Sequence, residues 1–367
     1  MGAVLITQRQ EGIKIKMRKR AKQETPFMKN GRRLLEELIA SCDGKCNPIR
    51  SFSAKDLQKA TNSYDSGQLI CEELDYKLYK GFLEDRPISV KKYMFLRGTS
   101  EYMGSPFTDV VVGSQMSSHK NVLKLIGCCL ESEHPILVYE FAGCETLSRF
   151  MSHHPDQIQS PPTPSWKSRI KIAVDVANAL AYLHTALSKR VIHRDITPAA
   201  ILMDVNYVAK LIDFSLAIAI PDGETDARER VVGTFRFVAP DCMMTGSYTE
   251  RSDVYSFGVV LLKLVVGQSE CNTSCSVTGG GLDLVSHFKN SIARDGIEEI
   301  LDPAIVAEGP WPGKERQLND FIDLALRCAH ESAEERPAMM DVGKELRKIY
   351  KCVISPCYLQ NIQAENM

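Results

Sequence analysis

Apolar runs separated by turn residues predict a small β-rich region in the first third of the chain. Residues 84–87 (EDRP) are a turn signal between two β-prone runs, and two longer apolar stretches follow. Residues 107–116 are expected to form one helix, although Gly113 lowers the helical propensity there. Strands are expected at residues 76–82, 88–94, 122–129 and 136–141.

The chain after residue 160 has the spacing of helices. Residues 166–185 place apolar side chains at helical intervals, and residues 254–266 are apolar all round, which predicts a buried helix. The polar, proline-rich residues 153–164 predict a surface loop, and residues 269–281 (SECNTSCSVTGGG) predict a flexible insert. Further helices are expected at residues 282–294, 318–330 and 339–352.

Two short helices are expected before the first strand. Residues 32–41 carry leucine and isoleucine on one face, and Asn30 is a candidate N-cap for that helix. Residues 52–61 predict a second short helix with Ser53 at its N-cap. Residues 1–29 are expected to be mobile.

Charge and cysteine content limit the protein classes. The 367 residues carry 45 basic and 46 acidic side chains, and this formal net charge of −1 gives no reason to expect nucleic acid as a partner. Residues 8–22 are strongly basic, which indicates either a solvated tail or a peripheral contact with an anionic membrane or an acidic partner. No run is long enough to span a membrane and no secretory signal is present, so the twelve cysteines are expected to be reduced thiols in the cytoplasm.

Four short motifs occur in one order along the chain. Residues 192–195 read Ile-His-Arg-Asp, residues 213–214 read Asp-Phe, residues 239–241 read Ala-Pro-Asp and residues 253–258 read Asp-Val-Tyr-Ser-Phe-Gly. Lys91 ends the run Ile-Ser-Val-Lys within an expected strand. In this order they resemble the catalytic loop, the magnesium loop, the end of the activation segment and the buried helix of protein kinases.

This resemblance covers roughly residues 52–352 and implies an α+β, bilobal protein-kinase-like fold. Such a fold has a small β-rich N-lobe with one helix and a larger, mainly helical C-lobe. The expected divisions are a basic N-terminal extension at 1–50 with a short helix at about 32–41, the N-lobe at 51–142, the C-lobe at 143–352 and a C-terminal tail at 353–367.

Longer tracts narrow the resemblance to plant receptor-like cytoplasmic kinases. Residues 52–61 (FSAKDLQKAT) resemble the pattern F-S-x-x-x-L-x-x-A-T of that family. Residues 121–130 (NVLKLIGCCL) resemble its fourth strand, and residues 136–141 resemble its hinge, with Tyr139 at the gatekeeper position.

Residues 30–50 and 115–125 look like one plant group, the pseudokinases related to the HopZ-effector-triggered-immunity-deficient kinase. This resemblance implies a cytosolic adaptor that pre-binds the leucine-rich-repeat part of a coiled-coil NLR immune receptor. It also implies binding to receptor-like cytoplasmic kinases that pathogen effectors modify. The activation segment, residues 215–241, would read the modified state of such a kinase, or it is a plain solvated loop. The candidate contact residues are Arg228, Arg230 and Arg236.

The stretch that should cradle nucleotide phosphates lacks its glycines. Glycine serves there because its backbone N–H can approach a phosphate closely. Aligned on residues 79–81 (YKG), the three glycine positions hold Cys71, Glu73 and Tyr76. Glu72, Glu73 and Asp75 also place negative charge against an anion. These substitutions predict poor ATP binding.

The lysine that phosphoryl transfer requires is present as Lys91, but two alignments give it different helical partners. One places Asp109 there, which is one methylene shorter than the usual glutamate, and the other places Val110, which cannot form an ion pair. Lys91, Tyr139 and Asp213 are the candidate nucleotide-contacting residues.

The catalytic and magnesium loops are retained in part. Asp195 stands at the position of the catalytic base, but Thr197 replaces a lysine that faces the transferred phosphate. Ala200 replaces an asparagine that binds magnesium, and a methyl group offers no ligand oxygen. Asp213 is the remaining metal ligand, and Ser215 replaces a glycine beside it, which is expected to restrict the backbone there.

These losses predict a pseudokinase adaptor that requires no cofactor and binds ATP and Mg²⁺ weakly. The alternative is a weak or unconventional serine/threonine kinase that uses Lys91, Asp195 and Asp213. A third interpretation is a nucleotide sensor that binds ATP without turnover. The same three residues would otherwise be hydrogen bonders that support the fold, as is expected of Asp253 and Arg336.

Overall fold

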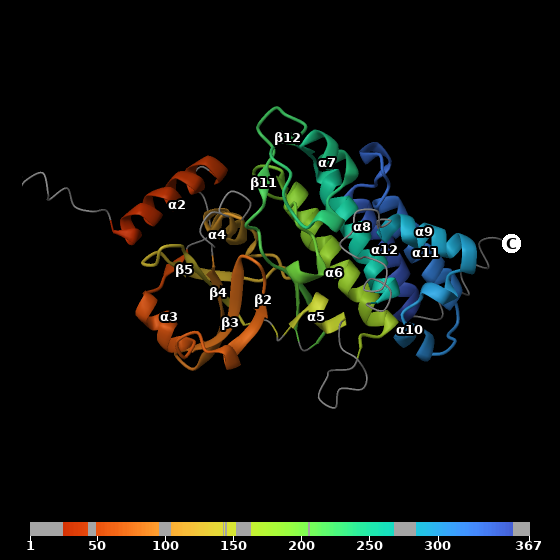
Figure 1. The fold of residues 1–367 in the computed structure, drawn as a ribbon, viewed down its shortest axis with the longest axis horizontal. Coiled ribbons are helices and arrows are strands. Elements are labelled where there is room, and N and C mark those ends of the chain that lie inside the picture. The colour runs from red at the N-terminus through yellow and green to blue at the C-terminus, as the bar shows by residue number, and fades with distance from the viewer. Residues whose placement is uncertain are drawn as a thin grey trace, which may run out of the picture.

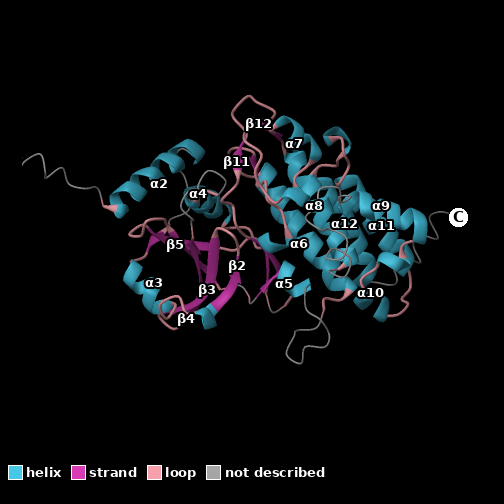
Figure 2. Cartoon of the chain, viewed as in Figure 1, coloured by secondary structure: helices cyan, strands magenta, loops and turns pink. Residues whose placement is uncertain are grey.

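A six-stranded sheet and a bundle of helices form the two lobes of the chain (Figure 1), and strands gather in one lobe while helices fill the other (Figure 2). The computed structural model describes residues 25–42, 49–94, 104–141, 143, 145–151, 163–204, 206–267 and 284–354. The basic tail at 8–22, the insert at 269–281, most of the loop at 153–164 and all but two residues of the tail at 353–367 lie outside the described residues.

The small-lobe sheet has the order β1-β5-β6-β4-β3-β2, antiparallel throughout except for the parallel pair β1 and β5. A side chain on Gly127 would place its Cβ 1.9 Å from the carbonyl oxygen of Arg50, so the glycine lets β1 lie against β5. All four strands expected from the sequence are present. The bounds are β1 Arg50–Ser51, β2 Leu69–Glu72, β3 Tyr76–Leu83, β4 Arg86–Tyr93, β5 Leu125–Cys129 and β6 Ile136–Glu140.

Two helices in this lobe begin at side-chain caps. Helix α3 (Ala54–Ala60) begins after Ser53, whose Oγ accepts a hydrogen bond from the backbone N–H of Asp56 at 3.1 Å. Helix α4 (Pro106–Met116) begins after Ser105, whose Oγ accepts from the N–H of Thr108 at 3.3 Å. Helix α4 lies almost wholly buried.

Helix α2 (Pro26–Cys42) is longer than the sequence analysis predicted, and it starts six residues earlier than 32–41. Asn30 is not its N-cap, since the residue lies inside the helix with its side chain buried. Its Nδ2 donates to the carbonyl oxygens of Leu130 at 3.1 Å and Ser132 at 2.9 Å. This contact with the turn after β5 fixes the extra helical turn, which local propensity could not reveal.

Helix α2 ties α4 to the large lobe. The Arg33 guanidinium lies over the Phe107 ring at 4.4 Å from its centroid. The Gln115 side chain donates to Ser41 Oγ at 3.0 Å, so both ends of α4 touch α2. At the C-terminal end of α2, the Lys189 ammonium of the large lobe donates to the Ala40 carbonyl oxygen at 3.2 Å.

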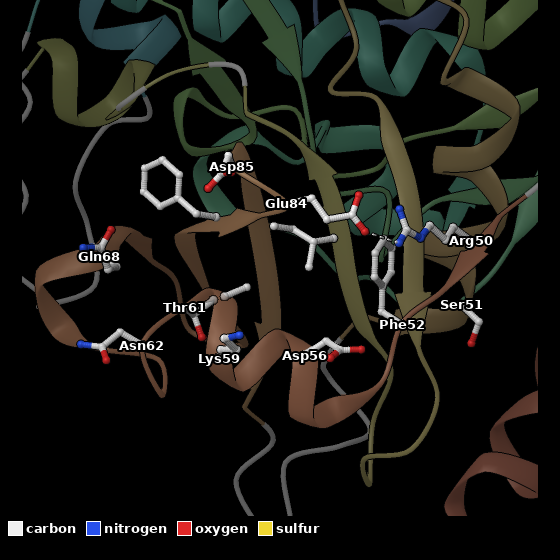
Figure 3. Close-up of a pocket in the computed structure, with 13 residues that line it drawn as sticks. Arg50, Ser51, Phe52, Asp56, Lys59, Thr61, Asn62, Gln68, Glu84 and Asp85 are labelled. Carbon is white, nitrogen blue, oxygen red and sulfur yellow. Dashed lines mark hydrogen bonds and ion pairs between the residues drawn. The ribbon is translucent and has the colours of Figure 1, made fainter.

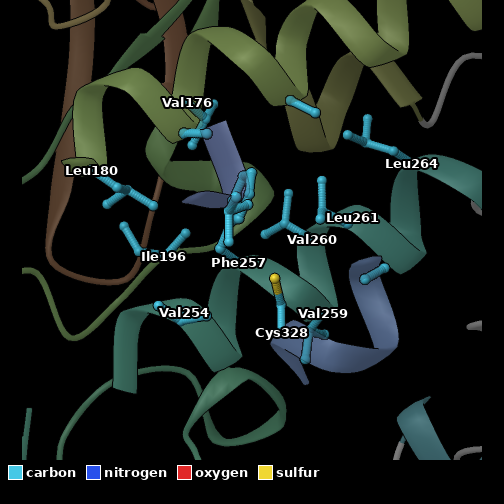
Figure 4. Packing of buried hydrophobic residues seen from close by; sticks show 14 of the residues in the cluster. Val176, Leu180, Ile196, Val254, Phe257, Val259, Val260, Leu261, Leu264 and Cys328 are labelled. Atoms are coloured by element: carbon cyan, nitrogen blue, oxygen red, sulfur yellow. The ribbon is translucent and has the colours of Figure 1, made fainter. Parts of the chain in front are cut away.

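The large lobe is built around helix α8 (Glu250–Val266), which is buried on all sides as its sequence predicted. Figure 4 shows Phe257 facing Val176 and Leu180 of α6 (Trp166–Thr185), while Val259 lies beside Cys328 of α11 (Lys314–Cys328). The remaining helices are α5 Leu147–Met151, α7 Pro240–Thr245, α9 Leu284–Asp295, α10 Pro303–Ala307 and α12 Met339–Ile354. Among the described residues, no helix has both the length and the apolar character needed to cross a bilayer.

Short strands and 3-10 turns shape the loops of the large lobe. Strands β10, β9 and β7 form a three-stranded sheet in that order. Strand β8 pairs with β11, and β12 pairs with β13. The bounds are β7 Glu145–Thr146, β8 Val191–Ile192, β9 Ile201–Met203, β10 Ala209–Leu211, β11 Ile218–Ala219, β12 Ala227–Arg228 and β13 Ser247–Tyr248. The 3-10 turns are η1 Ser66–Gln68, η3 Pro198–Ala200, η4 Phe235–Phe237, η5 Glu298–Ile300 and η6 Ala333–Glu335.

The Asn30 contact predicts a measurable loss of stability. Asn30→Ala leaves the carbonyl oxygens of Leu130 and Ser132 without their amide donor, and a cost of about 1–3 kcal/mol is expected for such groups. Urea unfolding followed by circular dichroism measures it. Lys29→Ala, at the exposed neighbouring position, is the matched control. Equal unfolding midpoints for the two variants would show that the contact contributes nothing.

Candidate functional site

The candidate site begins with side-chain alternation on β4. Lys91 and Tyr93 are two residues apart and therefore point to the same face of the sheet. On the neighbouring strand β3, Leu78 pairs with Lys91 and Tyr76 pairs with Tyr93. The register thus brings one lysine and two tyrosines together on the face that α4 covers.

Lys91 forms ion pairs with two carboxylates. Its Nζ lies 2.7 Å from Asp109 Oδ2 and 2.6 Å from Asp213 Oδ1, and only 3% of the lysine side chain is exposed. Asp109, rather than Val110, is therefore the partner on α4. The missing methylene does not prevent the pair.

Both oxygens of the Asp109 carboxylate accept hydrogen bonds. Oδ2 accepts from the Tyr93 hydroxyl at 2.7 Å and from the Tyr139 hydroxyl at 3.2 Å, in addition to Lys91. Oδ1 accepts from the backbone N–H of Phe214 at 3.0 Å. The two tyrosine hydroxyls supply donors around the shorter acid. Sequence reasoning missed Tyr93, which its position two residues after Lys91 would have indicated.

Charge and burial shift the pKa values of Lys91 and Asp213 in opposite directions. Burial alone lowers the pKa of Lys91, but Asp109 and Asp213 outweigh it and raise that pKa above the usual value. Burial alone raises the pKa of Asp213, but the Lys91 charge outweighs it and holds that pKa below the usual value. Lys91 and Asp213 are accordingly charged at neutral pH, and each neutralises the other.

Tyr76 covers Lys91 from the side of the β2–β3 hairpin. The lysine Nζ lies 4.0 Å from the centroid of the Tyr76 ring and 4.7 Å from that of Tyr93. Tyr76 is only 1% exposed. Cys71 is also buried, and burial raises the pKa of its thiol to about 12, so the thiol stays protonated. Two of the three expected glycine positions therefore carry side chains packed into the lobe.

The third glycine position, Glu73, lies in the turn between β2 and β3. The Glu73 N–H donates to the Tyr76 carbonyl oxygen at 2.9 Å, and the Met94 N–H donates to the Asp75 carbonyl oxygen at 2.7 Å. These bonds use backbone groups of the hairpin and tie its tip to β4. The turn that should meet phosphate thus hydrogen-bonds within the chain.

The catalytic loop is shaped by Asp253 of α8. Its carboxylate accepts from the backbone N–H groups of His193 at 2.8 Å and Arg194 at 2.9 Å, and it contacts His184 Nε2 at 2.8 Å. These bonds hold Arg194 at a φ of 70°, in the left-handed region that costs a side chain energy. Asp253 is thus structural. Its pKa lies below the usual value because His184 outweighs burial.

The candidate base, Asp195, is engaged by the activation segment. Its Oδ1 accepts from the backbone N–H of Thr234 at 2.9 Å. Burial raises its pKa, although the bond from Thr234 works in the opposite direction. A side chain on Gly233 would place its Cβ 2.5 Å from the Arg194 carbonyl oxygen, so glycine permits this close approach.

A cavity of about 620 Å³ separates the hairpin tip from the catalytic loop. Thr197 and Ala200 line it, and no lysine or arginine is among the lining residues. The acidic residues that line this cavity are Glu73, Asp75, Asp195 and Asp213. Burial, reinforced by the neighbouring carboxylates, raises the pKa of Glu73 to about 7 and that of Asp75 to about 6. The lining therefore offers carboxyl groups, and no side-chain cation, to an anion.

The residues present do not fit a magnesium–nucleotide complex. Asp213 Oδ1 already bonds Lys91, and Ala200 offers only a methyl group. Throughout the described segments, no cluster of three or more histidine, cysteine, aspartate or glutamate side chains has the arrangement of a metal site. The left-handed φ of 64° falls on Asp213, and the Ser215 N–H donates to Asp213 Oδ1 at 3.4 Å.

The three arginines of the activation segment are exposed and do not line this cavity, although Phe235, next to Arg236, does. Arg228 belongs to β12, with its Nε 3.5 Å from Asp226 Oδ2, and Arg230 follows it at an exposed position. Arg236 is exposed within η4. Sequence reasoning missed two apolar neighbours, Phe235 and Met244, which are 78% and 85% exposed.

A second cavity, of about 720 Å³, lies between α3 and the β3–β4 turn (Figure 3). Arg50 and Glu84 approach each other at its rim with 3.4 Å between Nη2 and Oε1. Phe52, Lys59 and Phe82 are also among its lining residues. None of the residues predicted from the sequence to form the site lies here.

The motifs, the two lobes and the Lys91 ion pair point to one family. The family model described as protein tyrosine and serine/threonine kinase matches residues 80–346. The chain belongs to the protein kinase family. The α+β, bilobal fold predicted from the sequence is thereby confirmed.

Relatives in Arabidopsis thaliana place the chain with the ZED1 and ZRK proteins, which confirms the resemblance found in the sequence. It is 39% identical over 332 residues to the non-functional pseudokinase ZED1, across 88% of this chain and 96% of that protein. It is 37% identical over 329 residues to the serine/threonine-protein kinase ZRK1, across 88% and 92%. It is 35% identical over 330 residues to the non-functional pseudokinase ZRK2, across 89% and 90%. The relatives thus include kinases and pseudokinases.

The buried network predicts a strong effect of one isosteric change. Asp109→Asn removes the carboxylate that faces Lys91, Tyr93 and Tyr139, and breaking a buried pair on one side is expected to cost about 3–5 kcal/mol. Urea unfolding at pH 7 measures the loss. Asp341→Asn, in the exposed pair with Lys344, is the control and should leave the unfolding midpoint nearly unchanged, because water screens an exposed pair. Similar losses for both variants would contradict the network.

The raised pKa of Glu73 predicts a pH-dependent stability. The pKa of Glu73 is about 7 in the folded state, above the 4.5 that is usual for glutamate, so the folded state binds this proton more tightly and stability falls as the pH rises from about 4.5 to about 7. Glu73→Gln removes this contribution, and its melting temperature should exceed that of the wild type by more at pH 8 than at pH 5. Glu72→Gln, at the exposed neighbouring position, is the control. A constant difference between Glu73→Gln and wild type across this range would refute the prediction.

Proposed function

We propose that this protein is a catalytically impaired, kinase-like adaptor of plant innate immunity. The observation that carries the proposal is the enclosure of Lys91 between Asp109 and Asp213 under the Tyr76 ring. Thr197 and Ala200 supply neither the cation nor the metal ligand that phosphoryl transfer uses. Relatives named non-functional pseudokinases, such as ZED1 and ZRK2, support this proposal. No cofactor is required in this role, and ATP and Mg²⁺ bind weakly.

The proposed role links the leucine-rich-repeat part of a coiled-coil NLR receptor to effector-modified receptor-like cytoplasmic kinases. Support comes from the resemblance of residues 30–50 and 115–125 to the ZED1-related group. The proposal places the protein in the cytoplasm. Contact of the basic residues 8–22 with the plasma membrane is a further element of it. Nucleic acid is not a proposed partner.

The activation segment is the proposed contact for the partner kinase. Arg228, Arg230 and Arg236 are exposed there, and Phe235 adds a largely exposed aromatic ring between the cationic positions. Arginine with an adjacent aromatic side chain is a composition enriched in interaction hot spots. A guanidinium also pairs readily with an added anionic group. This surface therefore suits a partner whose modification carries negative charge.

The absence of turnover is the first test of this role. Purified protein with ATP and Mg²⁺ or Mn²⁺ is expected to incorporate no phosphate into itself or into a generic substrate. The alternative function is that of an active serine/threonine kinase, as the relative ZRK1 is named. Such a kinase would use Lys91, Asp195 and Asp213. Incorporation that disappears in Asp195→Asn would establish that alternative and refute the proposed function.

The arginine surface is tested by partner capture. Alanine at Arg228, Arg230 and Arg236 together is expected to lower recovery of the modified partner kinase by at least about tenfold, equivalent to roughly 1.4 kcal/mol. Arg316→Ala, an exposed arginine on α11, is the matched control. Unchanged recovery with the triple variant would exclude the activation segment as the contact.

A further inference from the structure

We infer that Tyr76 occupies the place of the nucleotide phosphates, so that the site discriminates against phosphate rather than against adenosine. This inference rests on the proposed function and names the residue that closes the nucleotide site. In protein kinases the strand lysine pairs with the nucleotide phosphates. Here the ring of Tyr76 lies over that lysine, with Nζ 4.0 Å from the ring centroid.

The Lys91 ammonium is enclosed by two carboxylates and two aromatic rings. A lysine ammonium carries three N–H donors. Asp109 Oδ2 and Asp213 Oδ1 lie within 2.7 Å of Nζ, and the Tyr76 and Tyr93 rings present their faces to it. A phosphate could reach the ammonium only by displacing Tyr76 or one of the two carboxylates.

The position of Tyr76 is set by the backbone of the hairpin. Tyr76 pairs with Tyr93 in the β3–β4 register, and their rings meet edge to face with 6.3 Å between centroids. The bonds from Glu73 N–H to Tyr76 O and from Met94 N–H to Asp75 O hold the turn on both sides of this residue. These bonds fix the backbone at Tyr76, and displacing the ring from Lys91 would expose a side chain that is only 1% exposed here.

The space that remains beside Tyr76 does not suit phosphate either. The 620 Å³ cavity is bordered by Glu73, Asp75, Asp195 and Asp213. A triphosphate placed there would meet four carboxyl groups and no lining cation. Adenosine carries no charge and is not subject to this repulsion. The quantity to measure is therefore the ratio of the affinities for MgATP and for adenosine, rather than the affinity for either ligand alone.

Isothermal titration of MgATP and of adenosine into the same protein tests this inference. Wild type and Tyr76→Phe, which keeps the ring, are expected to bind MgATP no more tightly than adenosine. Tyr76→Gly restores glycine and is expected to increase the affinity for MgATP by at least about tenfold, with adenosine unchanged. Each protein is measured in two charge backgrounds, one with the native hairpin tip and one that also carries Glu73→Gln and Asp75→Asn. The second background removes the charge repulsion between the hairpin tip and a phosphate.

Two results would overturn the inference. One is a Tyr76→Gly protein that gains no MgATP affinity in either charge background. The other is a wild type that binds MgATP tenfold more tightly than adenosine, and this result needs no variant should Tyr76→Gly fail to fold. Wild-type MgATP binding without phosphate transfer would leave the proposed function intact. Phosphate transfer abolished by Asp195→Asn would refute that function, whatever the ratio of affinities.

Discussion

The carboxylate of Asp109 is the interaction on which the arrangement of the two lobes depends. It accepts hydrogen bonds from β4, from β6 and from the backbone of the magnesium loop, while it sits on α4. A buried charge without partners would be strongly destabilising, but here both carboxylate oxygens accept hydrogen bonds, so the network favours one relative position of these elements. In an active kinase the lysine–acid pair prepares a site for nucleotide. Here other side chains of the protein bond the same pair: Tyr93 and Tyr139 donate to Asp109, and Asp213 accepts from Lys91.

The N-terminal helix supports this arrangement from outside. Helix α2 contacts both ends of α4 through Phe107 and Gln115, and it reaches the large lobe through Lys189. Helix α4 is therefore fixed on one side by the Asp109 network and on the other by α2. The position of α4, which activating partners adjust in many kinases, is set here by contacts within one polypeptide.

Elements with strong periodicity could be predicted from sequence, and contacts between distant residues could not. Residues 166–185 match α6 because their apolar spacing needs no tertiary information. The choice between Asp109 and Val110 stayed open until the distance to Lys91 was known, since a one-residue shift in alignment leaves the local pattern unchanged. Asn30 resembled a cap because its chemistry suits one, but its amide bonds a turn one hundred residues away. The burial of Tyr76 depends likewise on the β3–β4 register.

The three contacts of Asp253 separate the shape of the catalytic loop from its chemistry. They are made by the backbone of His193 and Arg194 and by the ring of His184, none of which handles phosphate. The loop therefore keeps its conformation with threonine at 197 and alanine at 200. In evolutionary terms, catalysis can be lost from such a fold by substitutions that are neutral for folding. A lineage can then retain the inherited scaffold while selection acts on its outer surfaces alone.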